Sequence, residues 1–160
     1  MEEVLREFAI NLFQKAYQLQ TKGDVENAIT LYKQSIKTYP TAEAHTFLGW
    51  TYRGQGKLDL AIEECLAAIE VDPAFGYPYN DIGAYLIEKG KCVESIPWLE
   101  KATQAPRFDN PHYAWYNLGR VYFHLETLNK AKHCFDKALE LRPDYPDAKE
   151  ALRRLRSVLQ

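Results

Sequence analysis

Four histidines, three cysteines and one close pair of glycines are the residues of this 160-residue chain that could support catalysis, metal binding or phosphate binding. His133 and Cys134 are adjacent, but neighbours on a helix point about 100° apart, which is the wrong geometry for a nucleophile and its base. The four histidines form no H-E-x-x-H motif, and Gly54 and Gly56 lack the third glycine of a dinucleotide-binding loop. We therefore expect no catalytic residues and no enzymatic activity.

Cys65, Cys92 and Cys134 are far apart in the sequence and form no Cys-x-x-Cys pair. This spacing favours reduced thiols and predicts neither a metal site nor a cofactor. Cys65 stands where a repeating pattern, described below, has an aromatic residue. We expect a buried and unreactive thiol there.

The charge balance argues against two classes of partner. The net charge is −2, so the chain lacks the cationic field that attracts nucleic acids. Charged residues interrupt every turn of segment 1–8, which excludes a signal peptide or a membrane span there. We expect a protein that does not bind nucleic acid and has no membrane span, and that is cytoplasmic unless a leader sequence has been removed.

Small and bulky side chains recur along the chain at a nearly constant interval. Gly49, Gly83 and Gly119 are separated by 34 and 36 residues. Around each glycine, apolar residues lie three and four positions apart, which is the period of an amphipathic helix. Each repeat is therefore predicted to be a pair of helices that approach closely at small residues. These residues are Ala16, Gly49, Gly83 and Gly119 in the first helices and Ala28, Ala61, Ser95 and Ala131 in the second helices.

The last repeat carries the most complete motif. It contains Trp115, Leu118, Gly119 and Tyr122, followed by Ala131, Phe135 and Pro143. This spacing resembles that of the tetratricopeptide repeat family, and weaker copies extend the resemblance over residues 9–145. The resemblance implies an all-α fold, a right-handed α-solenoid of four helix-turn-helix repeats. We expect one domain, 1–160, with repeats at about 9–41, 42–75, 76–111 and 112–145 and a capping helix at about 146–159.

Turn residues mark the ends of the predicted helices. Gly23, Gly56 and Gly90 end the first three opening helices, where glycine readily adopts the left-handed conformation. The last repeat has Leu125-Glu126-Thr127 instead, so we expect slight strain or a different cap there.

Polar residues and prolines mark the predicted helix starts. We expect N-caps at Thr41, Asn110 and Asp144, and first-turn prolines at the positions Pro97, Pro111 and Pro146. The linker 105–111 is two residues longer than the period allows.

The closing segment 146–160 is predicted to form a cap that is polar on its outer side. Its apolar face is made of Ala148, Ala151, Leu152, Leu155 and Leu159. Arginines occupy the other faces, which indicates a solvated surface more than a site for an acidic partner.

In the family, the first helices line the inner, concave wall of the solenoid, and the resemblance places a partner-binding groove there. The predicted groove residues are Tyr17, Trp50, Arg53, Tyr77, Asn80, Tyr113, Tyr116, Asn117, Arg120 and Phe123. Tyrosine, tryptophan and arginine contribute much of the energy of protein interfaces. The two asparagines could hydrogen-bond the backbone of an extended peptide. The alternative is that neighbouring helices bury some of these side chains.

The predicted ligand is a protein or peptide segment with aromatic, aliphatic or proline residues, in which an acidic residue could meet Arg53 or Arg120. The lysines and asparagines with which co-chaperone members of the family hold a C-terminal carboxylate are absent. Phe13, Tyr17, Phe47, Tyr77 and Asp81 occupy the corresponding positions.

Three functions follow from this interpretation. The first is a non-catalytic protein–protein interaction module, a scaffold or adaptor. The second is a self-assembling homo-oligomer in which segment 4–17 docks into the groove of a neighbouring copy. The third is an accessory factor in pilus or secretion assembly, because the long third linker followed by Tyr116-Asn117-Leu118-Gly119 is similar to tetratricopeptide lipoproteins of pilus systems.

Overall fold

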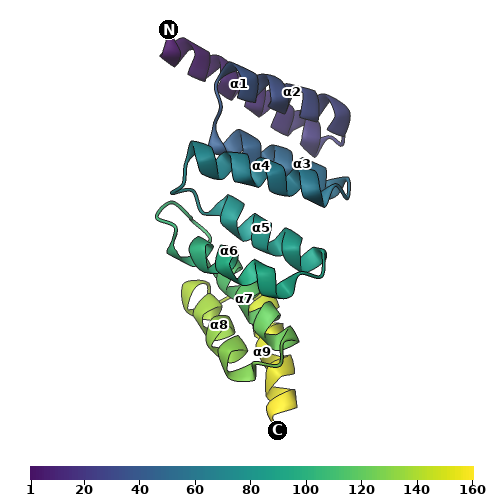
Figure 1. Ribbon diagram of the computed structural model, residues 1–160, viewed down its shortest axis with the longest axis vertical. Coiled ribbons are helices and arrows are strands. Elements are labelled where there is room, and N and C mark those ends of the chain that lie inside the picture. Colours follow the sequence, from purple (N-terminus) through teal and green to yellow (C-terminus); the bar gives the residue numbers. More distant parts are fainter. The chain divides into compact units, whose positions relative to one another are not determined.

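The computed structural model describes residues 1–160 and contains helices but no strand (Figure 1). The all-α prediction is confirmed. The nine helices are α1 (Glu2–Thr21), α2 (Val25–Thr38), α3 (Ala42–Gly54), α4 (Leu58–Val71), α5 (Tyr77–Glu88), α6 (Cys92–Gln104), α7 (His112–His124), α8 (Leu128–Leu141) and α9 (Pro146–Leu159).

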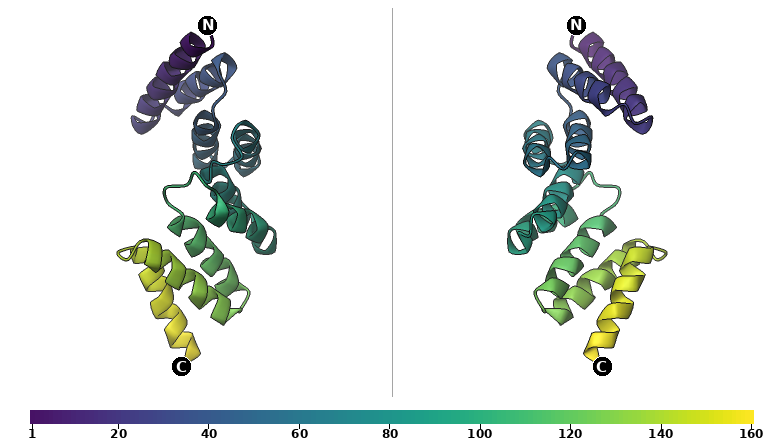
Figure 2. Two further views of the ribbon diagram at one scale, coloured as in Figure 1. Left: turned by 90° about the vertical axis from the view of Figure 1, so that its left-hand side faces the viewer. Right: turned by 90° about the vertical axis from the view of Figure 1, so that its right-hand side faces the viewer.

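The chain forms two compact units, Met1–Pro78 (unit 1) and Tyr79–Gln160 (unit 2), whose boundary falls in the first turn of α5. In unit 1, α1 pairs with α2 and α3 with α4 (Figure 2). In unit 2, α7 pairs with α8, and α9 packs on both. The predicted helical hairpins are therefore present, whereas the single domain, the repeat limits and the handedness of the solenoid stay predictions.

The small residues lie where helices approach each other. A Cβ atom built on Gly119 would overlap the ring of Phe135, and one on Gly83 would overlap Leu99. Phe135 and Leu99 are buried, so neither can move aside cheaply. The helical pattern predicted small residues at the crossings, and at these two positions the close approach disfavours even a methyl group.

The turns inside the hairpins follow the prediction closely. Gly23, Gly56 and Gly90 have φ angles of 87°, 76° and 77°. Glu126 takes the same left-handed conformation at φ 59° and is the only residue other than glycine with a positive φ. The expected strain in the last repeat is therefore confirmed, because a side chain at positive φ is disfavoured.

Two of the three predicted helix caps are wrong. Thr41 does cap α3, since its hydroxyl accepts from the backbone N–H of Ala44 at 3.1 Å. The N-cap of α7 is Pro111, with Asn110 contributing its backbone carbonyl to the N–H of Tyr113. The N-cap of α9 is Tyr145 rather than Asp144. Both helices thus start one residue later than expected, and at α9 this fits Pro146, which disfavours a helical conformation of the residue before it, Tyr145.

The prolines have mixed outcomes. Pro146 opens α9 as predicted. Pro97 was expected in the opening turn of its helix, but it is the sixth residue of α6 and lies inside the helix. Its position is exposed, so the backbone carbonyl that it leaves without a helical donor can meet water, and the helix continues to Gln104.

The predicted core and cap are also confirmed. The thiol of Cys65 is fully buried and free. In α9, Ala148, Leu152 and Leu155 are buried, although Leu159 stays half exposed. The connection 105–111 spans seven residues, against three between α2 and α3. None of the nine helices is both long enough and apolar enough to cross a lipid bilayer.

Candidate functional site

The predicted groove residues of unit 1 are joined by a chain of aromatic contacts. Phe47 is its centre, with ring centroids 5.7 Å from Tyr17 and 4.4 Å from Trp50. Trp50 in turn lies 6.4 Å from Tyr77. Phe47 was not predicted as a groove residue, although its place three residues before Trp50 on one helix puts both on the same face.

The predicted groove residues of unit 1 differ in exposure. Tyr17 is 48% exposed, and Arg53 in the last turn of α3 is also exposed. Trp50 and Tyr77 are partly buried, and Tyr77 packs beside Phe75. Unit 1 therefore offers a largely apolar wall with one arginine near its end.

The predicted groove residues of unit 2 form a polar network instead. Asn117 Nδ2 donates to Asn80 Oδ1 at 3.0 Å, and Arg120 Nη1 donates to Asn117 Oδ1 at 3.0 Å. The guanidinium carbon of Arg120 lies 5.8 Å from the ring centroid of Tyr116. The network runs from Asn80 on α5 through Asn117 to the exposed Arg120, and it holds the guanidinium group of Arg120 in position.

Burial changes the role of the two asparagines. Asn80 is 7% exposed and Asn117 is 8% exposed. The sequence suggested that both amides could face a peptide, but their hydrogen bond joins α5 to α7 inside the unit. A buried amide pair that is satisfied internally positions its neighbour, Arg120, rather than a ligand.

Tyr113 and Tyr116 are half-buried against a residue that was not singled out in the sequence. Their ring centroids lie 6.0 Å and 5.4 Å from that of Tyr145, which precedes α9. Burial raises the pKa of Tyr116, and its hydroxyl feels the charges of Arg120, Asp147 and Arg154. The alternative expectation, that neighbouring parts of the chain bury some groove residues, therefore holds in part for these two tyrosines.

A cavity of about 640 Å³ lies beside Tyr116 within unit 2. Three predicted groove residues line it, namely Tyr116, Arg120 and Phe123. The other lining residues are Ile87, Gly90, Cys92, Val121, His124, Phe135, Asp147, Glu150, Ala151 and Arg154. Its lining combines the rings of Tyr116, Phe123 and Phe135 with charged groups, a mixture that suits an apolar side chain of a partner next to a charged one.

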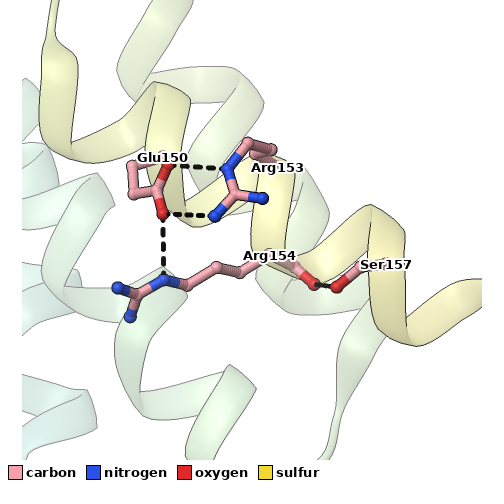
Figure 3. A network of polar contacts seen from close by, with 4 residues as sticks. All are labelled: Glu150, Arg153, Arg154 and Ser157. Carbon is pink, nitrogen blue, oxygen red and sulfur yellow. Dashed lines mark hydrogen bonds and ion pairs between the residues drawn. The ribbon is translucent and has the colours of Figure 1, made fainter.

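The charged side of this cavity is held by α9 (Figure 3). Arg153 donates to both carboxylate oxygens of Glu150, at 2.8 and 2.7 Å, and Arg154 Nε donates to one of them at 3.1 Å. These hydrogen bonds, chiefly from Arg153, lower the pKa of Glu150 to about 2. Glu150 therefore stays ionised and holds the Arg154 side chain at the cavity wall.

A second hollow of similar volume lies among α6, α7 and α8, lined by Trp115, Tyr122 and Cys134 among others. Burial, with Glu100 nearby, raises the pKa of Cys134 to about 11. This thiol is protonated at neutral pH and a poor nucleophile. The chain contains no group of three or more His, Cys, Asp and Glu side chains placed to hold a metal ion.

Two family models, each described as tetratricopeptide repeat, match residues 13–77 and 112–145. The chain belongs to the tetratricopeptide repeat family. Members of this family are generally non-catalytic modules for protein interaction, so the assignment indicates such a module.

Similar proteins agree with this assignment. The chain is 26% identical over 126 residues to the type IV pilus assembly protein PilF of Pseudomonas aeruginosa, covering 78% of this chain and 50% of PilF. Its fold matches the structure of PilW, a type IV pilus biogenesis factor, with a TM-score of 0.85 and 21% identity over 94% of this chain and 70% of that one. It also matches the first repeat domain of Spaghetti (RPAP3) bound to an HSP90 peptide, with a TM-score of 0.69 and 24% identity over 74% of this chain and 93% of that one.

The chain spans half the length of PilF and 13% of the length of zebrafish tetratricopeptide repeat protein 17, another relative that it matches. The two structural matches, at 21% and 24% identity, show a shared fold and nothing about shared partners.

Proposed function

We propose that this chain binds a peptide or protein segment on the walls formed by its first helices. The observation that carries the proposal is Arg120, an exposed cation held by Asn117 and Tyr116 at the wall of a cavity of about 640 Å³. A cation already held in place loses little rotamer freedom on binding, so more of its interaction energy appears as affinity.

The chemistry of the cavity describes the ligand. Tyr116 and Phe123 suit an aromatic, aliphatic or proline side chain, and Arg120 suits an acidic residue next to it. In unit 1, Tyr17, Trp50 and Tyr77 offer a second apolar surface, with Arg53 near its end. Each surface stands by itself as a place for a partner segment.

A displayed library of random peptides tests this proposal directly. We expect selection against the whole chain to enrich peptides with an aromatic, aliphatic or proline residue and an acidic residue. For a peptide so selected, Arg120→Ala should weaken binding by about 1 to 2 kcal/mol, because charged anchors in an interface typically contribute that much or more. Calorimetry measures the affinity, and circular dichroism checks the fold of the variant.

The matched control is Arg156→Ala. Arg156 is also exposed, but it lies on α9 and does not line the cavity. Equal affinity of the Arg120 and Arg156 variants, or a selection that enriches no peptide, would contradict the proposal for unit 2. Trp50→Ala applies the same test to unit 1, with an expected loss of about 2 kcal/mol for a peptide that binds there.

The likeness to PilF favours a second candidate function, accessory work in pilus assembly. The chain immobilised on beads would then retain pilus assembly proteins from a lysate of Pseudomonas aeruginosa, identified by mass spectrometry. Retention should fall with the Arg120→Ala variant if the same site is used. A set of retained proteins without any pilus component would argue against this candidate.

A further inference from the structure

The last helix, α9, contributes a wall to the cavity of unit 2. Four of its residues line that cavity, and their spacing of three and four positions puts them on one face of the helix. These residues are Asp147, Glu150, Ala151 and Arg154. The sequence indicated a solvated surface for the arginines of this helix, and Arg153 and Arg156 are indeed exposed and line no part of the cavity. Arg154 is exposed too, but it lies on the cavity face.

Arg154 is held in place and still has donors to offer. Its Nε atom donates to Glu150 at 3.1 Å, while Arg153 donates to both carboxylate oxygens of Glu150. The two terminal nitrogens of Arg154 lie on the side of its guanidinium group away from Arg153 and make no hydrogen bond within the chain (Figure 3). A guanidinium group held in this way presents a fork of N–H donors that fits a carboxylate.

Arg120 reaches the same cavity from α7 in a similar manner. Its Nη1 atom donates to Asn117 at 3.0 Å, and its other nitrogens are not used within the chain. Burial raises the pKa of Tyr116, whereas Arg120 and Arg154 both act to lower it, so both guanidinium groups lie within electrostatic range of this hydroxyl. Two cations from two helices are therefore presented around one hydroxyl group, which stays protonated at neutral pH and can donate as well.

The charged groups at and beside the cavity leave one positive charge unbalanced. Arg120, Arg153 and Arg154 carry three positive charges, and Asp147 and Glu150 carry two negative ones. Cations near one another repel, and an anion placed between them relieves that repulsion. A single carboxylate would balance the cluster, whereas a doubly charged phosphate would exceed it.

We propose, on the basis of the function proposed for unit 2, that the acidic side chain of a bound segment lies between Arg120 and Arg154 and accepts hydrogen bonds from both. The neighbouring apolar side chain of the segment then packs against Tyr116 and Phe123 in the same cavity. Because the two arginines belong to different helices, the site selects the position of the carboxylate as well as its charge.

A double-mutant cycle across the interface tests the role of Arg154. The probe is a peptide from the displayed library that contains one acidic residue and loses affinity with Arg120→Ala. We expect Arg154→Ala to weaken its binding about five- to tenfold. When the acidic residue of the peptide is replaced by its amide, Arg154→Ala should change the affinity by less than about twofold, because the carboxylate that Arg154 contacts is gone. Calorimetry measures the four affinities, and circular dichroism checks the fold.

The matched control is Arg153→Ala. It removes the same charge one residue away, from a side chain that is 70% exposed against 71% for Arg154 but does not line the cavity. This variant should change the affinity by less than about twofold. Amidating the C-terminus of the peptide should have no effect, since a side chain supplies the carboxylate. Equal losses in the two arginine variants, an equal loss with the amide peptide, or a loss caused by C-terminal amidation alone would overturn the proposal.

Two different failures can be told apart. A peptide that needs Arg120 but binds equally well to the Arg154→Ala variant would overturn the role of Arg154 and leave the proposed function of unit 2 standing. A selection that enriches no peptide dependent on Arg120 would overturn both.

Discussion

The α3–α4 hairpin of unit 1 and the α7–α8 hairpin of unit 2 are built on one pattern but differ at three matched places. At the helix crossing, Gly49 faces Cys65, whereas Gly119 faces the ring of Phe135. In the turn, Gly56 is replaced by Glu126. A Cβ atom on Gly49 would meet the backbone oxygen of Ala61 at 3.2 Å, a tight contact, whereas one on Gly119 would overlap the phenylalanine ring.

The third difference concerns the wall that we propose for binding. Phe47 and Trp50 form an edge-to-face pair on α3, whereas Asn117 and Arg120 form a hydrogen-bonded pair on α7. The repeat framework fixes the positions of these side chains but leaves their chemistry free. One wall can therefore bind by apolar contact and the other by charge, within a single fold.

The helix crossing should show the largest contrast. We expect Gly119→Ala to lower the free energy of unfolding by about 2 kcal/mol, because the new methyl group overlaps a buried ring. Gly49→Ala should change it by less than about 1 kcal/mol, since the contact is milder and alanine favours the helix. Denaturant unfolding followed by circular dichroism measures both. Equal effects of the two variants would break the comparison.

The next largest effect is expected at the hydrogen-bonded residues of unit 2, Asn80, Asn117 and Arg120. Asn117→Ala should cost about 1 to 2 kcal/mol of stability, because it leaves the buried Oδ1 of Asn80 without its donor and frees Arg120. Asn117→Asp is a useful companion, since the carboxylate still accepts from Arg120 but cannot donate to Asn80. Hydrogen exchange should show loosening of α5 and α7 in the alanine variant. Unchanged exchange there would mean that the network contributes little.

The turn is expected to have a smaller effect of opposite sign. Glu126→Gly should raise the free energy of unfolding by about 0.5 to 1 kcal/mol, because glycine adopts the left-handed conformation without strain. The matched change in the other hairpin, Gly56→Ala, should lower it by a similar amount. Thermal unfolding of the two variants gives the comparison. A destabilised Glu126 variant would show that its side chain makes a contact that outweighs the strain.

The smallest effect concerns pH. Burial, with Arg142 nearby, lowers the pKa of His112 at the start of α7. Because the folded state binds this proton less readily than the unfolded state, unit 2 should lose stability as pH falls below about 6.5, the ordinary histidine pKa. His112→Gln should reduce this loss, and His133→Gln, which alters an exposed side chain, should not. A pH series of unfolding curves decides between them.

The sequence was sufficient for the helical hairpins because their period depends on local side-chain size. The left-handed turns, the crossing glycines and the buried Cys65 all follow from short-range geometry. The caps at Asn110 and Asp144 were wrong because each helix begins one residue later than expected, after Pro111 in one case and at Pro146 in the other. Such one-residue shifts depend on backbone angles that residue type alone leaves open.

The candidate site was harder to predict. Tyr116, Arg120 and Phe123 line one cavity, and the helical pattern had grouped them because it identifies one face of a helix. It missed Tyr145, whose contact with Tyr116 joins residues distant in sequence, and it also missed Phe47, although the helical period places Phe47 on the same face as Trp50. It also left the burial of Asn80 open, which depends on how closely α5 and α7 approach.

The three cysteines make this protein convenient to label. Cys65 and Cys134 are buried, whereas Cys92 is partly accessible and lines the cavity beside Tyr116. A thiol-reactive fluorophore should therefore attach to one position without any change to the sequence. Its emission would report on whatever enters that cavity, so a bound segment could be detected before its identity is known.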